Sequence, residues 1–298
     1  MNIGEKRERV RNTIMGQVRI VADSTCDLSK ELLEQYEISV IPLCIVMNDK
    51  SYYDGVEVTP DQIYEWADAN RTTPKTSAIT FEYVEKVLRP FIDAGDEIIY
   101  LGISEKMSTT CNVIRLYAED ADYTDKIHVI DSMNLSTGIG LQLLYAAQLA
   151  REGKTAQEIV SLIESRRDKA RASFVVETLT YLARGGRCSA VTALLGNALN
   201  LKPEIVVENG AMKVAKKFRG KQASVILKYA EELKEDLLKA DPAVVFLTHS
   251  GCNRAVLDSV REYLAGLNHF ENIYETRAGG VISSHCGPGT LGILFYAE

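Results

Sequence analysis

The sequence lacks the long apolar segments that membrane-spanning and secreted proteins carry. No run approaches the ~20 apolar residues that a helix needs to cross a bilayer. Residues 1–17 are charged and have no apolar core of the kind found in signal peptides. We interpret this segment as a short leader that need not be ordered. The chain is therefore predicted to be cytoplasmic, with at most transient membrane contact.

Paired cysteines are also absent. The six cysteines are widely scattered, and no two of them form a C-x-x-C pair or show the spacing of a zinc site. Free thiols in a reducing compartment are the simplest account, and we expect no bound metal. The cysteines are Cys26, Cys44, Cys111, Cys188, Cys252 and Cys286.

Signatures of nucleotide-binding and nucleophilic enzymes are missing as well. The chain has no G-x-x-x-x-G-K-[ST], no G-x-G-x-x-G after its first strand, no H-E-x-x-H and no G-x-S-x-G. The net charge of −7 disfavours a nucleic-acid partner. We therefore expect no cofactor, no nucleic acid and no hydrolysis of ATP by this chain alone.

The most informative stretch that is present runs from Glu97 to Leu116. Its apolar residues are nearly continuous up to Ile103, which is typical of a strand covered by helices on both faces. Ser108 and Thr109 stand where the following helix is predicted to begin. A helix start offers unpaired N–H groups and a positive dipole end to a small anion. The alternative is that either residue only caps the helix.

Two more hydroxyl-rich turns precede helices in the first half of the chain. Asp23–Asp27 follows a strand at Val18–Ala22, and Thr73–Thr80, predicted to be a polar loop, precedes a helix at Phe81–Ala94. Right-handed crossovers in a parallel sheet bring such turns to one edge. We therefore expect the three hydroxyl-rich turns to converge.

Strands and helices alternate up to residue 170. This order predicts an α/β domain over 18–170, with a mainly parallel sheet flanked by helices. Ile38–Met47 contains Pro42, which favours an edge strand or an irregular one. Ser136–Arg151 is predicted to be an apolar helix.

Residues 171–298 follow a different order and predict an α+β domain with a mixed or antiparallel sheet. Asn209-Gly210 is a strong signal for a tight hairpin. Helices are expected at Ser189–Asn200, Lys221–Ala240 and Asn253–Leu267, and strands at Val244–Thr248 and near Ile273, Ile282 and Ile293.

Three further groups are candidates for binding an anion. Arg184–Arg187 encloses two glycines, which let backbone approach a ligand that a guanidinium can grip; the alternative is a helix C-cap with a surface arginine. His285 lies in a Gly/Pro/Ser-rich turn, where a structural histidine is the alternative. Lys216–Lys221 is a basic cluster that contains Arg219, or simply a solvated face.

Taken together, these segments resemble the DegV family of fatty-acid-binding proteins, the acyl-carrying subunits of bacterial fatty acid kinases. The resemblance spans nearly the whole chain from Val18 onward and rests on the order and spacing of eight motifs. They are Asp23-Ser-Thr-Cys-Asp-Leu, Lys75-Thr-Ser, Ser108-Thr-Thr, Asp131-Ser, Thr178-Leu-Thr-Tyr-Leu-Ala-Arg-Gly-Gly-Arg187, Leu201-Lys-Pro203, Phe218-Arg-Gly and His285-Cys-Gly-Pro-Gly-Thr-Leu-Gly.

The resemblance implies that a long-chain fatty acid lies between the domains, with its tail buried and its carboxylate held by hydroxyl groups. It further implies that a separate kinase phosphorylates the carboxylate to an acyl-phosphate for phospholipid synthesis. Arg187 and Arg219 would then meet the added phosphate or the kinase. The implied ligand-binding residues are Thr76, Ser77, Ser108, Thr109, Arg187, Arg219 and His285.

The sequence departs from the family pattern at three places. Ala78-Ile79 stands where the family usually has Gln-Pro, Thr109 replaces a glycine after the head-group serine, and Cys286 replaces a hydroxyl residue. The side chain of Thr109 could crowd the anion, so the head-group geometry is the least transferable feature.

Two other functions fit the residues less well. A stand-alone hydrolase would use Ser108 or Cys286 with His285 on a lipid or acyl ester, and a regulatory or scaffolding protein would bind a protein partner without regard to lipid. Under the favoured hypothesis the chain is a lipid-binding protein and not an enzyme. A helical apolar stripe could line the tail tunnel or be ordinary core. The stripe consists of Val191, Leu194, Leu195, Ala198 and Leu199.

Overall fold

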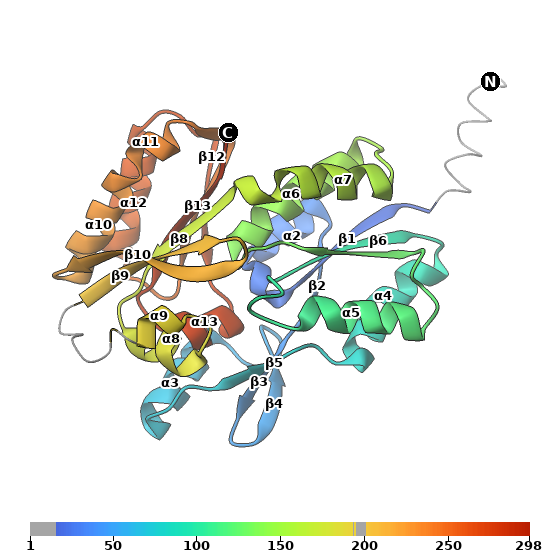
Figure 1. Cartoon of the computed structure of the whole chain (residues 1–298), viewed down its shortest axis with the longest axis horizontal. Coiled ribbons are helices and arrows are strands. Elements are labelled where there is room, and N and C mark those ends of the chain that lie inside the picture. Colours follow the sequence, from blue (N-terminus) through green and yellow to red (C-terminus); the bar gives the residue numbers. More distant parts are fainter. Residues whose placement is uncertain (1–15, 193, 195–200) are drawn as a thin grey trace.

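Three β-sheets organise the chain in the computed structural model, which describes residues 16–192, 194 and 201–298 (Figure 1). One sheet is parallel, one is mixed and the third is a small antiparallel sheet. The predicted combination of a parallel sheet with a mixed sheet is confirmed. No helix of the described residues is long and apolar enough to span a bilayer.

The parallel sheet has four strands in the order β2-β1-β6-β7. Along β6, Ile98 and Tyr100 enter one apolar core, and Ile99 and Leu101 enter another on the opposite face. Helices α4 and α5 cover one face, and α6 and α7 cover the other (Figure 1). The prediction of a central strand buried on both faces is therefore confirmed. The bounds are β1 (Val18–Asp23), β2 (Ser39–Ile41), β6 (Glu97–Gly102), β7 (Ile127–Asp131), α4 (Phe81–Asp93), α5 (Thr110–Asp120), α6 (Thr137–Arg151) and α7 (Ala156–Arg166).

The mixed sheet has six strands in the order β10-β9-β8-β13-β11-β12. Only the pair β11–β12 is parallel. The predicted Asn209-Gly210 hairpin joins β9 to β10, and both turn residues have positive φ. Helices α10, α11 and α12 pack on one face of this sheet. The bounds are β8 (Ala170–Val175), β9 (Leu201–Glu208), β10 (Ala211–Arg219), β11 (Ala240–His249), β12 (Asn272–Arg277), β13 (Leu291–Ala297), α10 (Gln222–Glu232), α11 (Lys234–Leu237) and α12 (Arg254–Gly266).

Helix α6 joins the two large sheets. It contacts β1 and β6 of the parallel sheet and also β8, β11 and β13 of the mixed sheet. Eleven of its 15 residues are buried, which explains why its sequence is apolar nearly all round. The two sheets therefore share one core through this helix, and their facing edges have a fixed separation.

The third sheet, in the order β4-β3-β5, was only partly foreseen. Thr73–Thr80 was predicted to be a loop, but Lys75–Ser77 forms β5, because β3 offers an edge to which even a polar segment can hydrogen-bond. The run Ile38–Met47 splits at Pro42 into β2 and β3, which lie in different sheets, since proline has no N–H to donate. The bounds are β3 (Cys44–Met47), β4 (Lys50–Tyr53) and the adjoining α3 (Pro60–Asn70).

Three predictions in the second half need correction or completion. The strand expected near Ile282 is wrong, because Gly280–Cys286 forms helix α13. The helix expected over Lys221–Ala240 breaks after α10, continues only through α11, and ends before β11 starts at Ala240. Of the helix expected at Ser189–Asn200, α9 (Ser189–Thr192) is seen, and Leu195, Ala198 and Leu199 lie outside the described residues.

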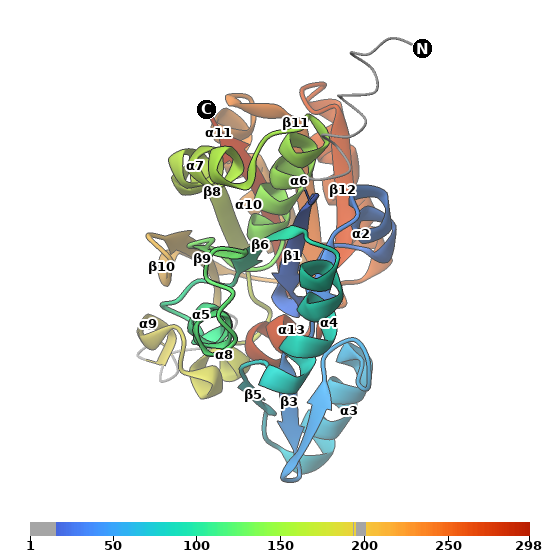
Figure 2. The same cartoon turned by 90° about the vertical axis from the view of Figure 1, so that its right-hand side faces the viewer.

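The remaining elements are short helices that connect strands. They are η1 (Ser24–Cys26), α2 (Lys30–Tyr36), η2 (Arg167–Lys169) and α8 (Leu179–Gly185). Of these, η1 directly follows β1, and Figure 2 shows α2 and α8 on opposite sides of the molecule.

Candidate functional site

A cavity of about 540 Å³ lies between the turns that follow the parallel strands and the mixed sheet with α13. Its volume falls in the range of small-molecule sites, about 300–1,000 Å³. Most of its lining is apolar. The apolar side chains are Leu43, Ala78, Ile103, Met107, Leu135, Phe174, Leu182, Met212, Ala278, Val281, Ile282, Cys286 and Leu294.

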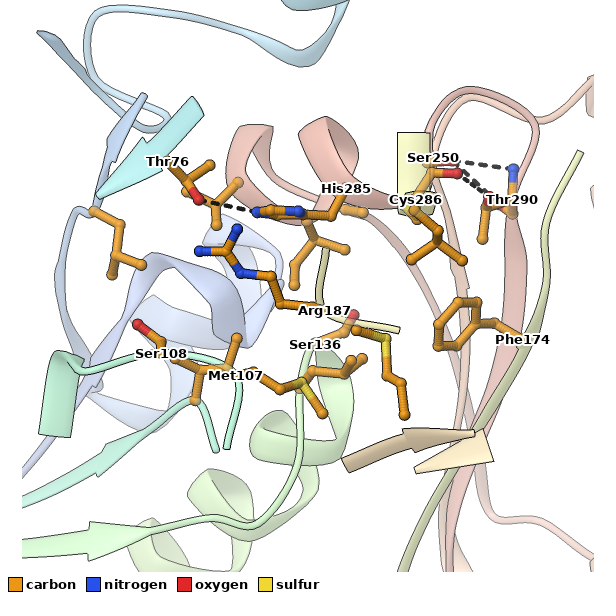
Figure 3. Close-up of a pocket in the computed structure, with 18 of the residues that line it drawn as sticks. Thr76, Met107, Ser108, Ser136, Phe174, Arg187, Ser250, His285, Cys286 and Thr290 are labelled. Atoms are coloured by element: carbon orange, nitrogen blue, oxygen red, sulfur yellow. Dashed lines mark hydrogen bonds between the residues drawn. The ribbon is translucent and has the colours of Figure 1, made fainter. Parts of the chain in front are cut away.

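Polar groups from both halves gather at one end of the cavity, which we call the open end. Figure 3 shows Thr76, Ser108, Arg187 and His285 there, opposite Phe174. Five lining residues are exposed to solvent, and all belong to β5 or to the turns after β6 and α8. They are Ser77, Glu105, Lys106, Thr109 and Arg187.

One polar contact at the open end joins Thr76 of β5 to His285 of α13. Thr76 Oγ1 and His285 Nε2 lie 2.9 Å apart, although 209 residues separate them in sequence. His285 Nδ1 is buried and has no hydrogen-bond partner among the described residues. Gly185 packs against it so closely that a Cβ there would lie 2.3 Å from Nδ1. Only glycine therefore fits beside this imidazole.

His285 is neutral at pH 7. Burial and the charge of Arg187 lower the pKa of its imidazole to about 4. Because an orphaned buried N–H is rarer than an orphaned acceptor, the proton belongs on Nε2, facing Thr76. The threonine hydroxyl then accepts from the ring and keeps its own proton for the cavity.

Two carboxylates from the first half hold α13 in place. The Gly279 N–H donates to Asp27 Oδ1 (2.7 Å), and the Gly280 and Val281 N–H groups donate to Asp54 (2.7 and 3.2 Å). Burial raises the pKa of Asp27 to about 8 and also raises that of Asp54. These partners lie more than 200 residues away in sequence, which explains why the local pattern around Ile282 did not predict a helix.

Ser108 and Thr109 both line the cavity, but they differ in their bonds. The Thr110 N–H reaches Ser108 Oγ (3.3 Å), and the hydroxyls of Ser108 and Thr110 lie 2.8 Å apart. Ser108 therefore both satisfies the helix start and faces the cavity. Thr109 occupies the N-cap position of α5 but makes no side-chain cap bond, so the capping alternative fails for it.

The two candidate arginines lie in different places. Gly186 caps α8 with φ of 68°, as the C-cap alternative expected, and the next residue, Arg187, lines the cavity. Arg187 Nη1 donates to Gly185 O (2.6 Å), which leaves further N–H groups of its guanidinium for a ligand. Arg219 ends β10 at the sheet edge and is not among the residues that line the cavity.

The first hydroxyl-rich turn does not reach the cavity, contrary to expectation. Ser24 donates to Asp54 (2.8 Å), and Thr25 is buried against Asp23. This turn builds the carboxylate cluster that supports α13, because its hydroxyls are turned toward its own acidic residues. Of the three hydroxyl-rich turns, those at Thr76 and Ser108 line the cavity. Ser136, a serine after β7, lines it too.

Hydroxyl groups also line the other end of the cavity, which we call the deep end. Ser250 Oγ donates to Gly287 O and accepts from the Thr290 N–H (3.0 Å), and Thr290 Oγ1 donates to Cys286 O (2.9 Å). Figure 3 shows this pair beside Phe174. These hydroxyls are bonded to the protein itself, so the deep end presents an essentially apolar surface.

Sequence reasoning missed Ser136, Asp54 and Phe174. Ser136 could have been found, because it follows a parallel strand as Ser108 does, and its hydroxyl donates to Asp27 (2.5 Å). Asp54 and Phe174 could not have been found in this way. No local signal connects either residue to a cavity.

Known proteins are similar to this chain over nearly its whole length. The family model described as "Uncharacterised protein, DegV family" matches residues 17–298. A "DegV domain-containing protein" of Clostridium perfringens is 34% identical over 285 residues, covering 95% of this chain and 99% of the relative.

Two solved structures have a similar fold. One is described as showing the fatty acid binding of a DegV family protein from Thermus thermophilus, with a TM-score of 0.86, 29% identity and coverage of 95% of this chain and 100% of the other. The other is a stearic acid-binding protein from Eubacterium ventriosum, with a TM-score of 0.81, 27% identity and coverage of 94% and 98%.

Proposed function

The chain belongs to the DegV family, and we propose that it binds one long-chain fatty acid in this cavity and presents the carboxylate to a separate kinase. One observation carries the proposal. Six of the seven candidate residues line a single apolar cavity. The polar groups that still have hydrogen-bonding capacity for a ligand gather at the end that opens to solvent. A molecule with one polar end and a long apolar body matches that distribution. The fatty acids bound by structural relatives have this form.

The open end can hold a carboxylate through hydroxyl groups and a guanidinium. When the His285 ring donates to the Thr76 hydroxyl, that hydroxyl can donate its own proton to the carboxylate. In the same way, the Ser108 hydroxyl can donate to the carboxylate when the Thr110 hydroxyl donates to Ser108. Arg187 adds a positive charge at the exposed mouth. Several donors are needed, because taking a carboxylate partly out of water costs several kcal/mol.

The tail supplies the affinity. Burying a sixteen-carbon chain at ~0.8 kcal/mol per methylene contributes up to about 12 kcal/mol before ordering costs are subtracted. The apolar lining and the internally bonded deep-end hydroxyls suit such a chain. The head group then fixes the orientation.

Presentation to a partner follows from where the carboxylate would sit. The five exposed lining residues all surround the open end, so a second protein can approach the head group while the tail stays buried. The chain lacks a nucleotide-binding motif, so the phosphoryl donor must come with the partner. Arg187 and, at greater distance, Arg219 would meet that partner or the new phosphate.

The hydrolase alternative is less well supported by the geometry. His285 contacts Thr76, and no carboxylate of the described residues bonds to its Nδ1 to orient it as in a catalytic triad. Burial raises the pKa of the Cys286 thiol to about 12, so it carries almost no thiolate at pH 7. The Ser108 hydroxyl forms its hydrogen bonds with Thr110, so neither candidate nucleophile pairs with the histidine in the way that catalysis would need.

The direct test is to identify the ligand. We expect organic extraction of denatured protein, purified from a lipid-replete host, to release about one equivalent of fatty acid by mass spectrometry. Arg187→Met with Thr76→Val should retain much less, while Phe218→Ala, which is remote from the cavity, retains the wild-type amount. Absence of fatty acid from the wild-type protein, together with no uptake of added palmitic acid, would contradict the proposal.

A further inference from the structure

We infer that Phe174 is the residue that sets ligand length, and that the deep end accepts only an unsubstituted hydrocarbon terminus. This inference rests on the proposed function, because it assigns a role to the far end of the same cavity. It adds a specificity residue that neither the sequence motifs nor the head-group contacts indicate.

Phe174 lies at the deep end, opposite the head-group residues (Figure 3). On the mixed sheet it pairs with Gly292 of β13 on one side and with Ile205 of β9 on the other. A Cβ at Gly292 would lie 3.1 Å from the Cβ of Phe174 and 2.8 Å from Ser173 O. Glycine at that position leaves room for the aromatic ring and for the end of a ligand beside it.

Beyond Phe174 the cavity is bounded by Leu294, which also lines it. The next residue of β8 on the same face is Ala172, which is 3% exposed and pairs with Leu294. Helix α6 packs on β8 and β13 in this region, and its buried face belongs to the same core as Ala172. Phe174 and Leu294 therefore stand between the cavity and a closely packed core, and Phe174 presents the larger side chain to a ligand that reaches this end.

The chemistry of the deep end determines which terminus it accepts. Ser250 and Thr290 use their hydroxyls on Gly287 O and Cys286 O, and the Thr290 N–H is bonded to Ser250. Thr248, which also lines the cavity, lies within hydrogen-bond distance of Thr137 and Thr276 (2.7 and 3.0 Å). Each of these groups already has partners, so a polar ligand terminus would lose its water without gaining new bonds.

The consequence is a sharp upper limit on chain length. Each methylene that enters the cavity increases affinity roughly fourfold, until the terminal methyl group meets Phe174. Longer chains must leave methylenes exposed at the open end, which displaces the carboxylate from Thr76 and Ser108. Affinity is therefore expected to rise along the series of saturated acids and then to fall.

Competition binding with the saturated acids from lauric to behenic acid tests this inference on the intact protein. We expect Phe174→Ala to move the optimum to an acid longer by about two methylenes, and Phe174→Trp to move it to a shorter one. The matched control is Phe218→Ala, since Phe218 is 7% exposed, against 8% for Phe174, but packs in the core on the other face of the sheet. This variant should lose stability without a shift of the optimum.

The outcomes separate the inference from the proposed function. If the wild type binds no acid of the series, the proposed function fails. If the wild type binds but neither Phe174 variant moves the optimum relative to Phe218→Ala, Phe174 does not set the length and the inference is overturned. Phe174→Trp covers the case in which the alanine variant fails to fold.

Discussion

The two ends of the cavity contain the same kinds of side chain but use them in opposite ways. Serine and threonine line both ends. At the deep end, Ser250 and Thr290 bond to neighbouring backbone, whereas at the open end Thr76 pairs with an imidazole whose other nitrogen has no partner among the described residues. Identical hydroxyl groups therefore behave as an apolar wall in one place and as ligand donors in the other.

This difference teaches that a count of polar residues does not reveal the polarity of a binding surface. A hydroxyl whose donor and acceptor capacity is used within the protein has little left for a ligand, and displacing those bonds costs about 1–3 kcal/mol. Bonding partners, and not residue types, thus assign head and tail to the two ends.

The largest expected effect compares palmitic acid with hexadecanedioic acid. Both carry the same head group and the same number of carbons, but the second places a carboxylate at the deep end, where the hydroxyls have no capacity left. We expect the diacid to bind at least about a thousandfold more weakly, equivalent to roughly 4 kcal/mol. Competition against a fluorescent fatty acid measures the ratio. Similar affinities for the two acids would show that water or free hydrogen-bonding groups solvate a carboxylate at the deep end, and that the two ends do not differ in polarity.

The second effect concerns pH, because the open end contains a buried histidine whose pKa differs between the folded and the unfolded chain. The pKa of His285 is about 4 in the folded protein and about 6.5 in the unfolded chain. The unfolded chain therefore binds this proton first as the pH falls, and the contribution of His285 to the free energy of unfolding drops between pH 6.5 and pH 4. Allowing for partial exposure of the ring, we expect a loss of about 2 kcal/mol.

The measurement is chemical denaturation at several pH values. His285→Gln should show a drop smaller by that amount, because the other groups titrate alike in both proteins. Cys286→Ser at the deep end serves as the control, since burial raises the pKa of the Cys286 thiol to about 12 and this group does not titrate here. Superimposable pH curves for His285→Gln and the wild type would rule out a neutral buried imidazole at this position.

The third effect comes from exchanging one hydroxyl at each end for a methyl group. Thr76→Val removes a ligand donor from β5 and also the partner of the His285 Nε2–H, so affinity for palmitic acid should fall about tenfold and the unfolding free energy by about 1 kcal/mol. Thr290→Val removes the bond to Cys286 O, so the unfolding free energy should fall by about 1 kcal/mol with affinity nearly unchanged. Calorimetry on both variants gives both quantities, and the reverse pattern would exchange the roles of the two ends.

The sequence predicts the layers of this fold better than it predicts the cavity. Apolar runs and alternation gave the parallel sheet, the mixed sheet and the Asn209-Gly210 hairpin, because these patterns are local. Helix α13 was missed because Asp27 and Asp54 satisfy its first N–H groups from more than 200 residues away. At the site, the motifs indicated the open end, whereas Phe174 has no local signature and emerges only from packing.

The domain boundary proposed near residue 171 and the kinase partner remain predictions. Strand β8 begins at Ala170 and belongs to the mixed sheet, but α6 from the first half packs on both large sheets. The order of strands and helices therefore separates two domains more clearly than the packing of the elements does. This packing between the two halves also brings Thr76 and His285 into contact.

The smallest expected effect tests whether every hydroxyl at the open end contributes. Thr109 is exposed and makes no cap bond, whereas Ser108, its neighbour, accepts a bond from the Thr110 N–H. Thr109→Gly restores the residue usual in the family and should change the unfolding free energy by no more than about 0.5 kcal/mol and the affinity by less than about twofold. Ser108→Gly, the matched control, should lose about 1 kcal/mol of stability and several-fold in affinity. A large gain of affinity in Thr109→Gly would instead mean that the threonine methyl group crowds the carboxylate, and that the head group lies closer to the start of α5 than to Thr76.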